Sequence, residues 1–192
     1  ATEAYVAGLH SDFSDPLALK AIQMIFDYLP ASYDGDAAAR GKMHVAQCLA
    51  GMAFSNALLG IAHSLAHKVG AQYEIPHGCC NAILLPNVVR YNAKACAARY
   101  ADIARALNLP GTTDEELVAA YVAAVDEPNR RLDIAPTFRE HGVSEEKFES
   151  TLDFVATQAF GDPCTGSNPR QTSPEDLKKI LRCCYEGKKV DF

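Results

Sequence analysis

The chain has 192 residues, which is enough for one domain with a substantial hydrophobic core. Hydrophobic residues make up 48% and charged residues 22%, as in ordinary globular proteins, and the formal net charge is −6. This charge argues against nucleic acid or an anionic membrane surface as the main partner, and no apolar run approaches the roughly 20 residues of a membrane span.

The first predicted element is a helix within residues 1–9, which are rich in helix formers. No capping residue precedes them, so the chain either begins inside a longer helix or was processed, and both explanations stay open here. A second helix is predicted to begin at Ser14–Pro16, where a capping side chain is followed by proline. Its apolar periodicity runs out at Pro30.

Residues 37–69 are rich in alanine and leucine and contain no proline, which predicts further helix. Ser55–Asn56 indicates a break that divides this stretch into two helices, and Gly70 is a candidate C-cap for the second. Residues 79–92 are predicted to form another apolar helix, interrupted at Pro86.

The remaining predicted helices begin with an amphipathic stretch at residues 94–108. Thr113 and Ser144 each precede acidic residues that suit the first turn of a helix. Ser173 opens a capping box with proline at the next position, and Gly187 is predicted to follow the end of that last helix.

The fold class is predicted to be all-α, because strand signals are nearly absent. The short β-branched runs in residues 83–89 lie in helical context. No internal repeat, low-complexity linker or Gly-rich nucleotide loop occurs. We therefore expect one all-helical domain over residues 1–192, with about eight or nine helices.

The seven cysteines include two adjacent pairs, Cys79–Cys80 and Cys183–Cys184, and no CxxC motif. An odd number without ligand spacing does not fit a disulfide framework or a zinc knuckle. We expect mostly small buried thiols in a reducing cytosol, and hence a cytoplasmic protein.

Three of the six histidines lie close together in the sequence. His63 and His67 are four residues apart, so they share one helix face and are able to chelate a divalent metal. The alternative is that they form ordinary hydrogen bonds in the core, and for an isolated HxxxH pattern this is the better explanation. Ser64 stands where the zinc proteases have glutamate, which argues against that class.

His77 strengthens the metal hypothesis, because it lies between a proline and a glycine at the expected start of a new helix. A chain reversal near Gly70 would bring it back toward His63, and three converging histidines are typical of a metal site. No acidic residue is an evident fourth ligand, since Glu74 is more simply a surface residue. The other three histidines have no such setting and are assigned no role: His10, His44 and His141.

The sequence segments around these histidines are long and specific enough to indicate a family. GMAFSNALLGIAHSLAHKVGA at 51–71 and IPHGCCNAILLPNVVRYN at 75–92 closely resemble the signature of the iron-containing (group III) alcohol dehydrogenases. Four further segments look like the same family: TEAYV, DPLALKAIQMIF, RYADIARAL and CTGSNPRQ. The resemblance covers essentially the whole chain. Within the family, the chain looks most like the bacterial NAD(P)H-dependent butanol dehydrogenases.

The resemblance implies a domain organisation. Family members have an N-terminal α/β domain that binds NAD or NADP, followed by an all-helical domain that binds metal and substrate. Residues 1–192 correspond to the helical domain, so the coenzyme domain is expected to be missing and the chain truncated. The family holds its metal with one Asp and three His, and Ala1 would come directly after a missing ligand histidine.

The resemblance also implies roles for residues. His63 and His77 match metal ligands, whereas His67 matches a histidine beside the metal, near the nicotinamide and the substrate. His67 is therefore the candidate catalytic and cofactor-binding residue. Phe54 and Cys164 match positions that line the substrate pocket, and the alternative for each is a plain core residue.

The implied reaction is the interconversion of a primary alcohol and its aldehyde by hydride transfer with NADP or NAD. The metal is expected to be Fe(II), with Zn(II) as the alternative. We expect the chain alone to be inactive and the complete enzyme to be a homo-oligomer. The competing hypothesis is a non-enzymatic helical module that binds metal or a protein partner.

Overall fold

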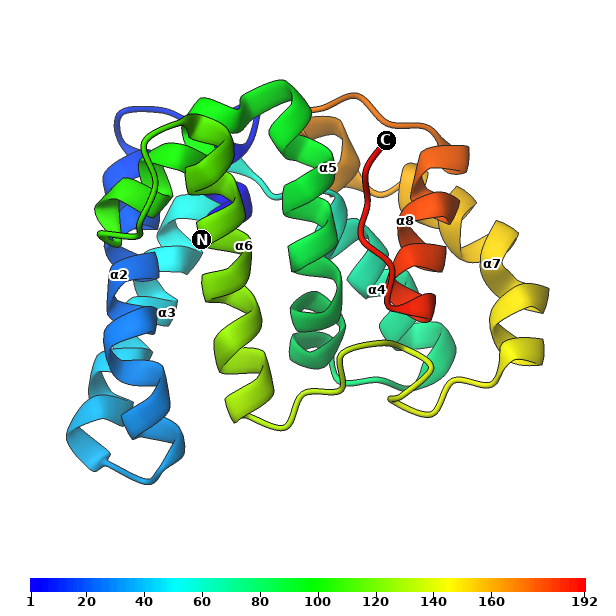
Figure 1. Ribbon diagram of the computed structural model, residues 1–192, viewed down its shortest axis with the longest axis horizontal. Helices are drawn as coiled ribbons and strands as arrows, with labels where there is room; N and C mark the ends of the chain where they lie inside the picture. Colours follow the sequence, from blue (N-terminus) through cyan, green and yellow to red (C-terminus); the bar gives the residue numbers. More distant parts are fainter.

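The computed structural model describes all residues, 1–192, and consists of helices without any strand (Figure 1). The helices are α1 (Thr2–Val6), α2 (Ser14–Tyr33), α3 (Ala37–Ala57), α4 (Ile61–Tyr73), α5 (His77–Ala106), α6 (Asp114–Arg131), α7 (Glu145–Phe160), the 3₁₀ turn η1 (Pro163–Ser167) and α8 (Pro174–Glu186). The predicted all-α fold class is therefore confirmed.

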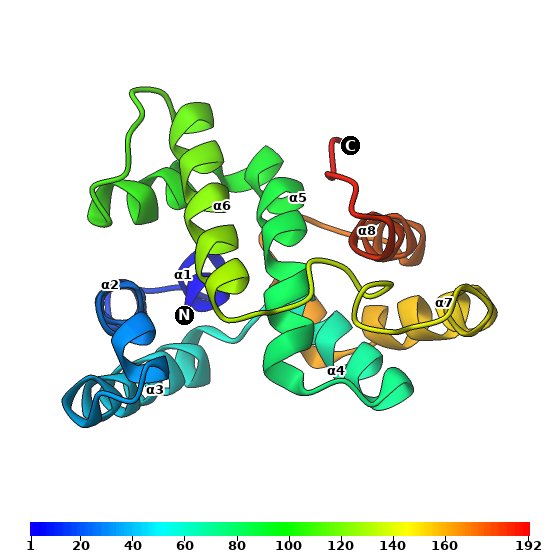
Figure 2. The ribbon, with the colours of Figure 1, turned by 60° about the horizontal axis from the view of Figure 1, so that its bottom comes forward.

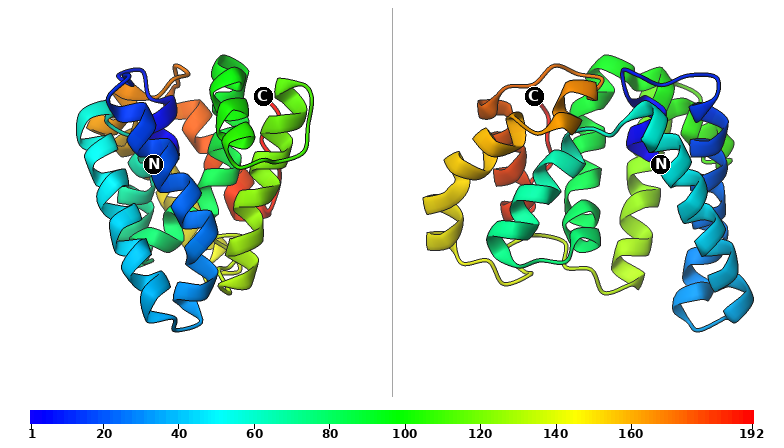
Figure 3. Two further views of the ribbon diagram at one scale, coloured as in Figure 1. Left: turned by 90° about the vertical axis from the view of Figure 1, so that its left-hand side faces the viewer. Right: turned by 180° about the vertical axis from the view of Figure 1, so that it is seen from behind.

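The long helix α5 runs through the middle of the molecule and separates two groups of helices (Figures 1 and 2). On one side α2 and α3 form an antiparallel hairpin, whose turn projects beyond the other helices (Figure 3). The short α1 lies between this hairpin and the α5–α6 pair (Figure 2). On the other side lie α4, α7 and α8.

Two hydrophobic cores follow from this arrangement. The N-terminal core is built from α1, α2, α3, α6 and the second half of α5, whereas the C-terminal core is built from α4, α7, α8 and the first half of α5. Val88 belongs to the C-terminal core and its neighbour Val89 to the N-terminal core, and both are fully buried. The middle of α5 thus joins the two halves and fixes their spacing.

The helix N-termini that have a side-chain cap lie where the sequence predicted them. Thr113 and Ser173 each accept a hydrogen bond from the backbone N–H three residues later and complete a capping box, and Ser144 caps α7 in the same way without the reciprocal bond. Gly187 ends α8 in the left-handed conformation at φ 72°.

Several helix ends differ from the prediction. Pro30 lies inside α2, which continues to Tyr33, and the predicted cap at Ser14–Pro16 makes no side-chain hydrogen bond at the N-cap itself. The break between α3 and α4 falls at residues 58–60, not at Ser55–Asn56. Helix α4 passes Gly70 and ends only where Glu74 adopts the left-handed conformation. These ends are set by tertiary packing, which outweighs local propensity.

Helix α5 is continuous through Pro86, where an interruption was predicted, and its two predicted halves are joined across a kink at Cys96 (φ −142°, ψ 42°). Pro86 has no N–H to donate to the carbonyl of Ala82 one turn earlier. Asn129 of α6 donates its side-chain N–H to that carbonyl at 2.9 Å. The neighbouring helix therefore supplies the bond that the proline removes.

The cysteines form no disulfide. Only Cys80 and Cys184 are buried, and burial raises their pKa values to about 11 and about 12. The expectation of mostly buried thiols is wrong, because Cys48 is exposed on α3 and the other four are partly exposed.

No single helix is long and apolar enough to cross a membrane. Helices α3 and α4 pass that test only as a pair, and they are bent by 108° relative to each other.

Candidate metal centre

The three clustered histidines meet between helix α4 and the first residue of α5. His63 is the third residue of α4, His67 follows one turn later, and His77 is the first residue of α5. Glu74 at φ 60° turns the chain back between the two helices. The ring centroids lie 5.3 Å apart for His63 and His77, 5.5 Å for His67 and His77, and 6.1 Å for His63 and His67.

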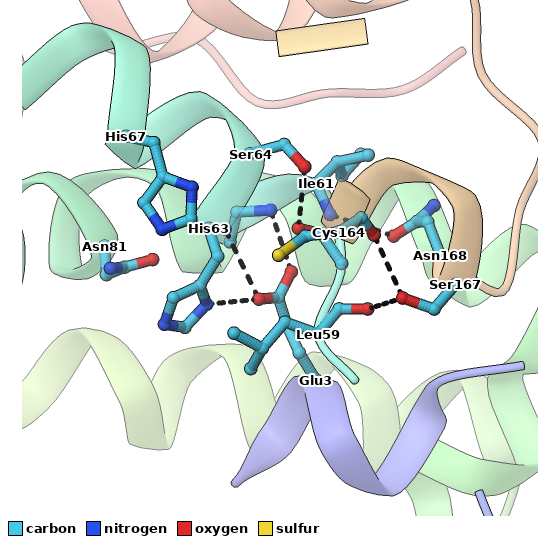
Figure 4. Close-up of polar contacts among 12 residues, drawn as sticks. Glu3, Leu59, Ile61, His63, Ser64, His67, Asn81, Cys164, Ser167 and Asn168 are labelled. Atoms are coloured by element: carbon cyan, nitrogen blue, oxygen red, sulfur yellow. Dashed lines mark hydrogen bonds and ion pairs between the residues drawn. The ribbon is translucent and has the colours of Figure 1, made fainter. Parts of the chain in front are cut away.

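A buried carboxylate holds the first of these rings. Glu3 of α1 is only 4% exposed, and its Oε2 lies 2.5 Å from Nδ1 of His63 (Figure 4). The same carboxylate accepts hydrogen bonds from the backbone N–H groups of Ala62 at 2.8 Å and His63 at 3.3 Å. Glu3 thus binds both the ring and the backbone that carries it.

The N-terminus of α4 has no cap of its own, since Gly60 precedes it. The unpaired N–H groups of residues 61–63 are satisfied by distant side chains: Ile61 donates to Oδ1 of Asn168 at 3.3 Å, and Glu3 accepts from the other two. A Cβ on Gly60 would lie 2.7 Å from Glu3 Oε1 and 2.8 Å from Asn168 Oδ1. Only glycine leaves room for this arrangement.

A second carboxylate holds His67. Asp162, 8% exposed, places Oδ2 at 3.1 Å from Nδ1 of His67 and at 3.0 Å from Nζ of Lys68. Burial opposes ionisation of this carboxyl, but hydrogen bonds from the Cys164 N–H, Lys68 and His67 outweigh it and lower its pKa to about 2. Asp162 is therefore a carboxylate at neutral pH and accepts from Nδ1 of His67.

His77 has a different setting. Its Nε2 lies 3.0 Å from the side-chain nitrogen of Asn81, one turn along α5. Partial burial lowers the pKa of His77, and the neighbouring rings of His63 and His67 add to this effect. A neutral imidazole is the form that binds a metal ion. Oδ1 of Asn81 is buried beside this ring without a hydrogen-bond partner.

The two predicted pocket residues lie in different places. Cys164, in η1, is near the histidines: its Sγ and one ligand atom each of His67 and Asp162 lie within 4.8 Å of one another. Burial and the adjacent Asp162 raise the pKa of Cys164 to about 11, so it is a neutral thiol and not an activated nucleophile. Phe54, on α3, packs partly buried against the N-terminal core.

A cavity of about 280 Å³ opens beside His63 between α1, α2, α5 and α6. His63, Glu3 and Asn81 contribute polar groups to its wall. Its remaining lining is mainly apolar and includes Ile22, Ile25, Phe26, Leu29, Leu85, Val125 and Leu132. Neither Phe54 nor Cys164 lines it.

The sequence prediction missed the residues that hold the histidines. Glu3 and Asp162 lie 60 and 95 residues away from His63 and His67, so no local spacing connects them. The only acidic residue close to the histidines in the sequence is Glu74, which was assigned to the surface, whereas the fold brings two carboxylates to the rings. Asn81 was also missed, although it lies one helical turn after His77 and i,i+4 spacing provides a signal.

The residues fit a transition-metal ion. Imidazoles that bind one ion through nitrogens about 2.1 Å from it have ring centres about 5 Å apart in a tetrahedral site, close to the observed spacings. Ligating histidines usually donate their other N–H to a carboxylate, as His63 is placed to do. A bound ion lies in the plane of each ligand ring, and His67 and His77 are stacked at 16° to each other. The rings of His63 and His77 are tilted by 54° to each other.

Comparison with known proteins identifies the family to which the chain belongs. Residues 1–185 match the family model described as the Fe-containing alcohol dehydrogenase family, C-terminal. The chain is 55% identical over 192 residues to an NADPH-dependent butanol dehydrogenase of Clostridium saccharobutylicum, matching 100% of this chain and 50% of that protein.

Solved structures give the same result. A 1,3-propanediol oxidoreductase superposes with a TM-score of 0.89 at 33% identity, covering 95% of this chain and 48% of the other. An iron-containing alcohol dehydrogenase of Thermococcus thioreducens superposes with a TM-score of 0.87 at 36% identity, covering 97% and 48%. The chain thus spans about half the length of these relatives. It belongs to the iron-containing alcohol dehydrogenase family and corresponds to its C-terminal domain.

Proposed function

We propose that this chain is the metal- and substrate-binding half of an alcohol dehydrogenase that interconverts a primary alcohol and its aldehyde with NADP or NAD. The observation that carries the proposal is the convergence of three imidazoles, two of them held at Nδ1 by buried carboxylates. The relative named as an NADPH-dependent butanol dehydrogenase supports NADP and a short alcohol.

His63 and His77 are proposed to hold iron, with zinc as the alternative, since imidazole suits both metals. The ion, when bound, supplies a Lewis acid for the oxygen of the alcohol or aldehyde. Its other ligands are proposed to come from a segment before Ala1, together with a coenzyme domain, because the relatives are about twice as long as this chain. Assembly into a homo-oligomer is likewise a proposal.

His67 is proposed to act on the proton of the reaction and to contact the nicotinamide part of the coenzyme. With Nδ1 on Asp162, its other ring nitrogen is free to take up or release a proton near the substrate. Asp162 keeps the ring oriented. Cys164, close to the same ring, is proposed to line the substrate pocket, and Phe54 is retained as a second pocket residue.

The test is metal content in a chimera that joins the upstream half of the C. saccharobutylicum butanol dehydrogenase to this chain. His63→Ala and His77→Ala should each lower the bound iron, measured by plasma emission, at least tenfold. His67→Ala should retain the metal but lose turnover. His44→Ala, an exposed histidine on α3, is the matched control and should change neither. Loss of metal in His67→Ala but not in His63→Ala would reverse the assignment.

A further inference from the structure

We infer that Glu3 is a positioning residue, whose carboxylate fixes the His63 imidazole with its ring proton on Nδ1 and so leaves the Nε2 lone pair for the metal ion. The inference rests on the proposed function, because it gives His63 the role of a ligand. Glu3 acts only through His63.

The position of the Glu3 carboxylate is fixed from three directions. Oε1 accepts from the Ala62 N–H at 2.8 Å, and Oε2 accepts from the His63 N–H at 3.3 Å. Both donors belong to the first turn of α4, where the helix dipole favours a negative group. No lysine or arginine side chain forms an ion pair with Glu3, so its polar contacts are with α4 and with the ring of His63.

This fixed carboxylate determines the tautomer of His63. Oε2 lies 2.5 Å from Nδ1, and a carboxylate only accepts hydrogen bonds, so Nδ1 must carry the proton. In a neutral imidazole the proton is then absent from Nε2, which keeps its lone pair. Selecting this tautomer before metal arrives removes the need to move a proton or turn the ring on binding.

Gly60 also helps to hold the Glu3 carboxylate in place. Its φ of −147° does not require glycine, so the requirement is spatial. A Cβ there would lie 2.7 Å from Glu3 Oε1, closer than side chains tolerate, and would push the carboxylate away from α4. Gly60→Ala therefore displaces Glu3 without changing its chemistry, and provides a second variant.

Glu3→Gln separates positioning from packing. The amide has almost the same shape, and its oxygen still accepts from the Ala62 N–H. Its NH₂ group then faces Nδ1 and donates to it, so the His63 proton must move to Nε2. The Ala62 hydrogen bond at the helix start is kept and the longer bond from the His63 N–H is lost, while Nε2 of His63 no longer offers a lone pair to the metal.

The first experiment records long-range ¹H–¹⁵N correlations of the histidine rings of the metal-free 192-residue chain at about pH 8, where imidazole is neutral. We expect His63 to be protonated at Nδ1 in the unchanged chain and at Nε2 in Glu3→Gln. Asp162→Asn removes the carboxylate beside His67 and serves as the matched control, which should leave the His63 signals unchanged. A proton on Nε2 of His63 in the unchanged chain would overturn the inference.

The second experiment measures iron affinity in the chimera. Glu3→Gln should weaken binding about 10–100-fold, while its thermal unfolding in the absence of metal changes little. Gly60→Ala should weaken binding in the same direction. If both variants bind iron as the parent does, the inference is wrong. Failure of the proposed function is recognised separately, because His63→Ala would then leave the iron content unchanged whatever the tautomer is.

Discussion

At the scale of single residues, the centre depends on two carboxylate–imidazole pairs that come from distant parts of the chain. Glu3 from α1 binds His63, and Asp162 before η1 binds His67. Each carboxylate is buried and also accepts backbone N–H groups, so each ring is held by a fixed partner. The two rings thereby acquire different surroundings although they lie one helical turn apart.

The low pKa of Asp162 makes a prediction about stability and pH. Its folded value of about 2 lies below the ordinary value of 3.8, so ionisation stabilises the fold by about 2 kcal/mol above pH 4. Asp162→Asn should lower the unfolding free energy by about this amount at neutral pH. The difference should shrink as the pH falls from about 4 to about 2, where Asp162 becomes protonated in the folded protein as well.

Denaturant unfolding followed at several pH values measures this difference. Asp153→Asn is the matched control: Asp153 is exposed on α7 and pairs with Lys178, and exposed pairs contribute little. A constant difference down to about pH 2 would show that Asp162 stabilises the fold by another route than its charge.

The sequence identified the three clustered histidines because they lie in one short stretch. It missed Glu3 and Asp162, since nothing local links a carboxylate to a ring 60 or 95 residues away. The ring distances alone would allow His63 to share a metal ion with either His67 or His77. The family resemblance is what assigned His77 as a ligand and His67 as a neighbouring catalytic residue.

At the scale of helices, the ends with a capping side chain were predictable and the others were not. Thr113, Ser144 and Ser173 carry their own signal, because each side chain satisfies an N–H of the helix that follows. Helix α4 has no such residue and starts where Glu3 and Asn168 satisfy its N–H groups from elsewhere. Its start is therefore a property of the fold and was not visible in the local sequence.

Helix α5 gives a prediction at this scale. Asn129 donates to the Ala82 carbonyl that Pro86 leaves without a helical donor. Asn129→Ala should lower the unfolding free energy by about 1–3 kcal/mol, because the carbonyl loses its partner in a partly buried site.

A double-mutant cycle with Pro86→Ala checks the mechanism. An alanine at position 86 restores a backbone N–H for the Ala82 carbonyl. Asn129→Ala should therefore lower the unfolding free energy much less in the Pro86→Ala protein than in the unchanged one. Equal costs in both backgrounds would show that Asn129 acts through other contacts. Thermal or denaturant unfolding of the four proteins provides the measurement.

At the scale of the whole molecule, α5 joins two cores and carries His77 at its first turn. The three histidines lie beside the contact between α1, from the N-terminal core, and α4, from the C-terminal core, which Glu3 and His63 make. The sequence predicted the all-α class and the single helical unit, but not the division into two cores. Helix α5 reaches from one core to the other and kinks at Cys96, near the point where the sequence predicted a new helix.

The 192-residue chain alone should not reduce butanal with NADPH, since the proposed coenzyme domain and remaining metal ligands are outside it. The chimera with the upstream half of the butanol dehydrogenase should do so. Turnover followed by NADPH absorbance compares the two proteins. Comparable rates with and without the upstream half would contradict the proposal that the coenzyme domain and the remaining metal ligands lie outside the chain.

The central claim is that His63 and His77, and not His67, bind the metal. Anomalous diffraction at the iron edge from crystals of the iron-loaded chimera tests it most directly. We predict one strong peak about 2.1 Å from a ring nitrogen of both His63 and His77, with His67 beyond bonding distance. A peak bonded to His67 in place of His77, or held among His67, Asp162 and Cys164, would contradict the account.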